Sequence, residues 1–179
     1  MSKQNLVILL TILVGISTRF MEILPPNFGA IGAIALFGGA YFSNRTIGLL
    51  LPLSVLLASD LIIGLTGTGT ALYTSQPFVY GGFLLIGLLG FLLRTGRSPV
   101  KIMGGSLAGS VIFYLVSNFG VWLTSGFYAK TFGGLISCYG AAIPFFKYTV
   151  AGDLVFNTVF FGVAYLIAQR FPTLISAIK

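Results

Sequence analysis

The chain has 179 residues, of which 56% are hydrophobic and only 7% are charged, with a net charge of +7. A soluble globular domain carries about 25% charged residues, so this composition excludes a polar surface of the usual kind. It predicts an all-α integral membrane protein. Because a spanning helix needs about 20 apolar residues, the length leaves no room for a soluble domain, and residues 1–179 are expected to form a single transmembrane domain.

The residue types also exclude several kinds of chemistry. The chain has no histidine, one cysteine (Cys138) and three acidic residues. Zinc sites and Ser-His-Asp or Cys-His catalytic groups cannot be assembled from this set. We therefore expect no enzyme activity, no metal and no cofactor. The basic residues are spread thinly along the chain, so nucleic-acid binding is not expected either.

Six apolar segments are predicted to span the membrane. The first, Asn5 to Ile23, resembles a signal peptide with a small-residue cleavage site near Gly15, but we interpret it as a retained helix. Pro25 and Pro26 then break the chain. The remaining spans are predicted at Phe28 to Phe42, Thr46 to Leu65, Phe78 to Leu93, Val100 to Thr124 and Tyr148 to Gln169.

Residues 125–147 form a weaker apolar stretch that contains Lys130, Gly133-Gly134 and Pro144. This pattern predicts a loop with a short interfacial or re-entrant helix on the outer side.

Six spans place both termini on one side of the membrane. That side holds seven Lys and Arg residues, namely Lys3, Arg45, Arg94, Arg97, Lys101, Arg170 and Lys179. The other side holds three, namely Arg19, Lys130 and Lys147.

The positive-inside rule therefore predicts that both termini are cytoplasmic, and that the basic loop at residues 94–101 fixes the topology. All three acidic residues then fall at the outer side of the membrane. Charged groups inside a bilayer normally face a cavity or the bundle interior, because exposing them to lipid costs about 2.5 to 3.5 kcal/mol each. These positions predict an outward-facing polar and aromatic pocket with seven ligand-binding candidates: Arg19, Asp60, Tyr114, Asn118, Trp122, Asp153 and Asn157.

The spacing supports this prediction. Asp153 and Asn157 are four residues apart and share a helix face with Thr149, and Tyr114, Asn118 and Trp122 repeat the same spacing. Arg19, with Lys130 or Lys147, would hold a carboxylate or phosphate of a ligand, and the two aromatic side chains would stack on a ring. The alternative is a structural network, in which Arg19 pairs with Glu22, or Asp60 and Asp153 pair with Arg19 or Lys147.

Small residues recur four apart in two of the predicted spans. Such faces allow helices to pack closely in a membrane, either within the chain or against a partner subunit. The partner-docking candidates are Gly29, Ala33, Ala35, Gly39, Gly105 and Gly109.

Residues 25–65 read PPNFGAIGAIALFGGAYFSNRTIGLLLPLSVLLASDLIIGL. A Gly/Ala-rich helix leads through Asn44-Arg45 into a helix that ends in Ser59-Asp60 and Gly64. This arrangement resembles the S components of energy-coupling factor (ECF) transporters and related small bacterial membrane proteins. The resemblance implies a vitamin-like micronutrient bound from outside, a partner membrane subunit, two cytoplasmic ATPases, and a place in the bacterial cytoplasmic membrane.

Three functions remain open on the sequence. The first is a substrate-binding subunit of a micronutrient uptake transporter, and it is the one we favour. The second is a non-catalytic accessory subunit of a membrane complex, in which the polar cluster is structural. The third is a membrane enzyme or an ion-coupled carrier that works alone. An enzyme is the weaker of these two because the chain has few acids and no histidine for acid–base chemistry, and a carrier would need Asp60 or Asp153 to titrate or to bind a cation.

Overall fold

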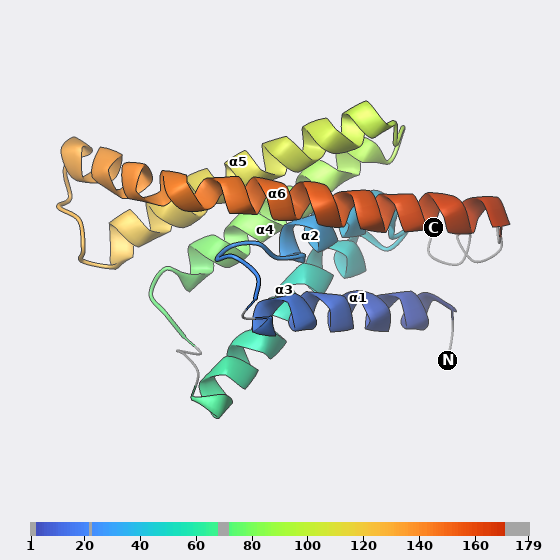
Figure 1. The fold of residues 1–179 in the computed structure, drawn as a ribbon, viewed down its shortest axis with the longest axis horizontal. Coiled ribbons are helices and arrows are strands. Elements are labelled where there is room, and N and C mark those ends of the chain that lie inside the picture. Colours follow the sequence, from blue (N-terminus) through green and yellow to red (C-terminus); the bar gives the residue numbers. More distant parts are fainter. Residues whose placement is uncertain (1–2, 22, 68–71, 171–179) are drawn as a thin grey trace.

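The computed structural model describes residues 3–21, 23–67 and 72–170. In these residues the chain forms six α-helices and one 3-10 helix, and no β-strand (Figure 1). In chain order they are α1 (Lys3–Phe20), α2 (Ile31–Tyr41), α3 (Arg45–Thr66), α4 (Gln76–Gly90), η1 (Phe91–Leu93), α5 (Pro99–Thr124) and α6 (Phe132–Arg170). The all-α prediction is confirmed.

In the described part of the chain, four helical segments are long and apolar enough to cross a membrane: α3, α4 with η1, α5 and α6. Large apolar side chains cover their outer faces. On α5 they form a continuous stripe at four-residue spacing, which is the face expected to contact lipid. The stripe consists of Met103, Leu107, Val111, Leu115, Phe119 and Leu123, each between 40% and 55% exposed.

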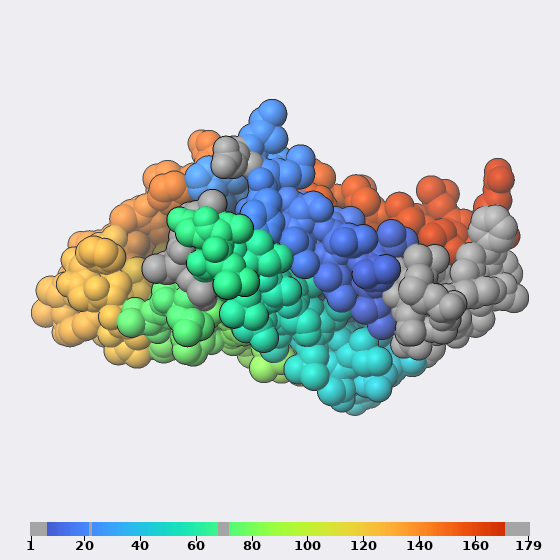
Figure 2. All heavy atoms as spheres, turned by 90° about the horizontal axis from the view of Figure 1, so that it is seen from below, coloured from blue at the N-terminus to red at the C-terminus, as the bar shows by residue number. Residues whose placement is uncertain are grey.

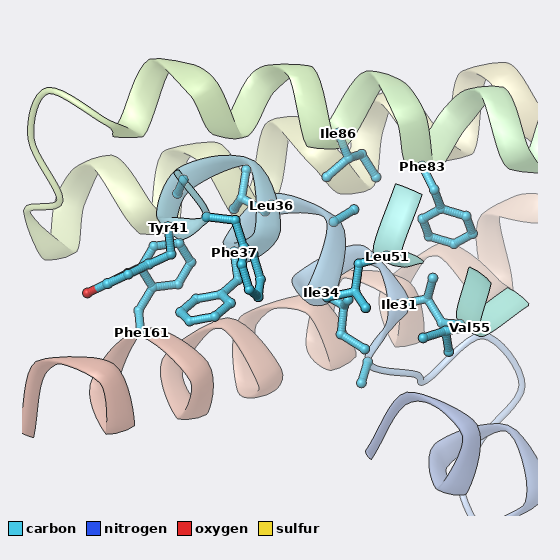
Figure 3. Packing of buried hydrophobic residues seen from close by; sticks show 14 of the residues in the cluster. Ile31, Ile34, Leu36, Phe37, Tyr41, Leu51, Val55, Phe83, Ile86 and Phe161 are labelled. Carbon is cyan, nitrogen blue, oxygen red and sulfur yellow. The ribbon is translucent and has the colours of Figure 1, made fainter. Parts of the chain in front are cut away.

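α2 is shorter and occupies the centre of the molecule. All 11 of its residues are buried, which is expected for a helix that is apolar on every side. Its side chains contact α3, α4 and α6, with Phe37 stacked against Tyr41 and packed edge-on against Phe161 (Figure 3). At about 1.5 Å per residue α2 is roughly 16 Å long, so it cannot cross a 30 Å hydrocarbon core alone. The segment predicted as the second span is a buried half-length helix.

Two arginines satisfy the carboxyl end of α2. The last carbonyls of a helix lack intrahelical partners, and in a membrane protein water cannot replace them. Arg94 donates to the carbonyl oxygens of Gly39 at 2.8 Å and Phe42 at 2.5 Å, and Arg97 donates to that of Ala40 at 2.7 Å. The basic loop at residues 94–101, predicted only to fix topology, therefore also caps the central helix. Burial, together with nearby Arg45 and Arg97, lowers the pKa of Arg94.

The small-residue faces are used inside the chain. Ala33 and Ala35 are fully buried. A Cβ atom at Gly39 would overlap the carbonyl oxygen of Gly87 on α4, and one at Gly109 would lie 3.3 Å from Ile86. Gly105 faces Leu36 and Leu93, and Gly29 lies against the backbone of Gly152. Gly39 and Gly109 thus bring α2 and α5 close to α4, while docking of a partner by the six residues stays a prediction.

A second correction concerns residues 125–147. Only a short connection separates α5 from α6, and α6 then runs without interruption from Phe132 to Arg170, past Pro144. Gly126, with φ of 75°, takes the left-handed conformation where the chain turns. The predicted sixth span and the predicted interfacial segment are thus one helix of 39 residues. Its first part packs on the end of α5 as a hairpin that forms one end of the molecule (Figures 1 and 2).

Candidate functional site

A cavity of about 490 Å³ opens where α1 ends and α2 begins. Its wall includes the chain between these two helices and side chains from α3, α4, α5 and α6. The lining is mostly apolar, with the rings of Phe28, Phe83 and Phe113 among its contributors. Its polar side chains are few, namely Thr18, Arg19, Asn27, Tyr73, Thr149 and Asp153. Size, apolar walls and a small number of polar groups are typical of small-molecule sites.

The local sequence explains why the cavity forms here. Pro25 and Pro26 cannot continue α1, and Asn27 adopts a left-handed conformation with φ of 66°. The chain therefore turns back towards the molecule before α2 starts. Thr18 anchors this turn, since its hydroxyl accepts a hydrogen bond from the Ala30 amide at 3.3 Å.

Arg19 lines the cavity but already has an acidic partner. Its Nη2 atom lies 2.7 Å from Asp60 Oδ1. The second oxygen of Asp60 accepts hydrogen bonds from Gln76 Nε2 at 2.9 Å and from the Tyr80 hydroxyl at 3.0 Å. The Asp60 side chain is 3% exposed and that of Arg19 is 25% exposed. Among the structural pairings left open by the sequence, the described residues contain the one between Arg19 and Asp60; Glu22 lies outside the described residues.

Asp153 lines the same cavity in a different environment. It is 5% exposed, and its Oδ2 atom accepts a hydrogen bond from Ser110 at 2.6 Å. No Lys or Arg among the described residues forms an ion pair with it. A Cβ atom at Gly32 would overlap Asp153 Oδ1, so the absence of a side chain there makes room for the carboxylate beside the first turn of α2.

Asn157 lies one helical turn further along α6 and does not line the cavity. Its Nδ2 atom donates to Ser106 Oγ at 3.0 Å, and its Oδ1 atom is buried without a hydrogen-bond partner in the described residues. Together with the Ser110–Asp153 contact, this bond forms a buried polar connection between α5 and α6.

The other three predicted ligand-binding residues lie in the α5–α6 hairpin and none lines the cavity. The Tyr114 hydroxyl donates to the Tyr139 carbonyl at 2.7 Å, and Asn118 Nδ2 donates to the Tyr114 carbonyl at 2.7 Å. Trp122 Nε1 donates to the Ala129 carbonyl at 3.0 Å, and Lys130 donates to the Trp122 carbonyl. The Asn118 bond lies within α5, and the others link α5 to α6 or to the chain that connects the two helices. Lys147, the other predicted anion-holding residue, lies over the Tyr148 ring at 4.8 Å.

Sequence reasoning missed the aromatic lining and Tyr73. Phe113 is adjacent to the predicted Tyr114, so the stripe was placed one residue away from the side chain that faces the cavity. Tyr73 lies between α3 and α4, in a segment whose residues 68–71 are outside the described part of the chain. Burial and the Asp60 carboxylate raise the pKa of Tyr73, which keeps its phenol neutral. Thr149 could have been predicted to line the cavity, because it lies four residues before Asp153 on the same helix face.

A family model described as a family of unknown function (DUF6580) matches residues 1–174. The chain belongs to this family. No curated protein and no solved structure matches it. The DUF6580 match therefore covers nearly the whole chain but brings no activity with it, and any function has to be argued from the cavity itself.

Proposed function

We propose that this DUF6580 protein is the substrate-binding component of an uptake system in the bacterial cytoplasmic membrane. The observation that carries the proposal is the cavity of about 490 Å³, which combines apolar walls with two charged side chains: Arg19, which is paired with Asp60, and Asp153, which has no ion-pair partner among the described residues. A ligand of vitamin size fits such a volume. The four long apolar helices support a place in the membrane.

In this proposal the cavity opens to the outer side and both termini are cytoplasmic. The basic groups support this orientation. Arg45 and Arg94 share contacts with the Phe91 ring at 5.4 and 4.9 Å, so they lie together at one end of the helices. Arg19 and the cavity lie at the opposite end of α1 from Lys3. The cluster would face the cytoplasm, as positive-inside sorting favours.

The proposal also includes partners. The chain would bind the ligand, while a second membrane subunit and cytoplasmic ATPases would supply energy. The partner subunit would contact exposed faces such as the α5 stripe, because Gly39 and Gly109 are already packed against α4 within the chain.

Native mass spectrometry of the protein, purified in a mild detergent from its own host, tests the proposal. We expect an additional small organic mass on part of the population, together with co-purifying ATPase subunits. The additional mass should be lost in Asp153→Asn and kept in Asn118→Ala, because Asn118 bonds only within the α5–α6 hairpin. A protein that carries no small mass, but always carries a partner without an ATPase, would contradict the proposal and favour an accessory subunit.

A further inference from the structure

We propose that the ligand of this cavity is an organic cation, and that Asp153 is its counter-ion. The inference rests on the proposed function, since it specifies the chemical class of the molecule bound. It also reverses the expectation from sequence, in which Arg19 recruited a carboxylate or phosphate.

The charges around the cavity carry the inference. Two charged side chains among the described residues line it, Arg19 and Asp153. Arg19 is neutralised by Asp60 at 2.7 Å, and that carboxylate accepts two further hydrogen bonds, from Gln76 and Tyr80. The pair therefore contributes little net charge to the cavity. Asp153 has no basic partner in the described part of the chain, so the ionised site is left with one uncompensated negative charge.

The surroundings of Asp153 hold the carboxylate in place without cancelling its charge. Ser110 donates one hydrogen bond to Oδ2. A carboxylate offers about four lone-pair positions, so others stay open for a donor on a ligand. The start of α2 lies against Oδ1, and its partial positive charge of about half an elementary charge offsets only part of the carboxylate charge. A buried carboxylate without an opposite charge is unfavourable because it has lost its hydration, and a cation that enters the cavity offsets that cost of desolvation.

The remaining lining describes the rest of the ligand. Phe28, Phe83 and Phe113 supply ring surfaces, and Leu56 and Val79 add aliphatic surface. Aromatic faces attract cations as well as flat apolar groups. These walls favour a flat apolar body over a small hydrated metal ion. Thr149, one turn before Asp153 on α6, adds a hydroxyl on the same side.

Three probes of similar shape and different charge test the inference: phenethylammonium, phenethyl alcohol and 3-phenylpropanoate. Their binding is measured at neutral pH by saturation-transfer NMR with the protein in nanodiscs of uncharged lipid. We expect the cation to bind at least tenfold more tightly than the other two. In Asp153→Asn, which keeps the shape of the side chain and its contact with Ser110, the preference for the cation should fall below about twofold while the alcohol still binds.

The results separate the two proposals. Tighter binding of the alcohol or the carboxylate would overturn the cationic ligand and leave a small-molecule site in place. Equal preference for the cation in wild type and in Asp153→Asn would overturn the role of Asp153. Absence of binding by all three probes, with no small mass on the purified protein, would overturn both. Because the probe comparison on the wild-type protein needs no substitution, a variant that fails to fold does not remove the test.

Discussion

Replacing Gly39 by alanine tests the close contact on which the central helix depends. A Cβ atom at this position would overlap the carbonyl oxygen of Gly87 and lie 3.1 Å from Gly90 Cα. Both obstacles are backbone, which cannot move aside as a flexible side chain would. We expect α2 and α4 to separate by roughly 1 Å, a gap that forfeits a quarter to a half of the dispersion energy of each contact.

The free energy of unfolding should fall accordingly. Overpacking of this kind costs about 1–3 kcal/mol, and alanine recovers about 0.5–1 kcal/mol of helix propensity, which leaves a net loss of about 1.3 kcal/mol at the middle of the two ranges. At about 2–4 °C per kcal/mol for a chain of this length, the melting temperature should drop by roughly 3–5 °C. Cys138 is 2% exposed, so a thiol-reactive dye reports unfolding of the detergent-solubilised protein.

Gly104→Ala is the matched control. Gly104 lies on α5, and nothing is within 4 Å of the position its Cβ would take. The same chemical change should therefore leave the melting temperature unchanged or raise it, because only the gain in helix propensity remains. Equal melting temperatures for the Gly39 and Gly104 variants would refute the packing argument.

Three further predictions concern other parts of the molecule. Asp60→Asn should lower the free energy of unfolding by about 3 kcal/mol, since it removes one member of a largely buried ion pair; an unchanged melting temperature would contradict this. Arg94→Ala should lower the free energy of unfolding by a similar amount, because two carbonyls at the carboxyl end of the central helix lose a charged donor. Arg45→Ala removes only a contact with the Phe91 ring, so it should lower the free energy of unfolding by less than about 1 kcal/mol. In a cysteine-free background, Phe127→Cys should react with a membrane-impermeant thiol reagent in intact cells and Thr95→Cys should not; the opposite pattern would reverse the proposed orientation.

The class of fold followed from composition alone, because 7% charged residues cannot cover a soluble domain of this length. Hydropathy also located most helices. It failed at two places for physical reasons. Residues 31–41 are apolar because neighbouring helices surround them, a pattern that hydropathy does not distinguish from contact with lipid. Lys130, Gly133-Gly134 and Pro144 suggested a loop, yet α6 continues past Pro144 with α5 packed along it.

The candidate site was predictable only in part. Arg19 and Asp153, both named as candidates because of their expected depth in the membrane, line one cavity. Which charges are paired depends on tertiary contacts, so the sequence left open whether Arg19 was available to a ligand. Tyr114, Asn118 and Trp122 have the right spacing for a functional face, but the same spacing serves the α5–α6 hairpin. Residues at four-residue spacing lie on one face of a helix, but the spacing does not show whether that face contacts a ligand or another helix.

The most direct test of the cavity as a ligand site is to fill it. Thr149→Trp adds bulk to the lining, and Leu115→Trp adds a similar bulk to the exposed stripe of α5, where the leucine is 48% exposed. Native mass spectrometry of the three proteins, purified identically from the same host, should show a small organic mass on wild type and on Leu115→Trp and none on Thr149→Trp. A mass retained equally by a folded Thr149→Trp protein would contradict the account.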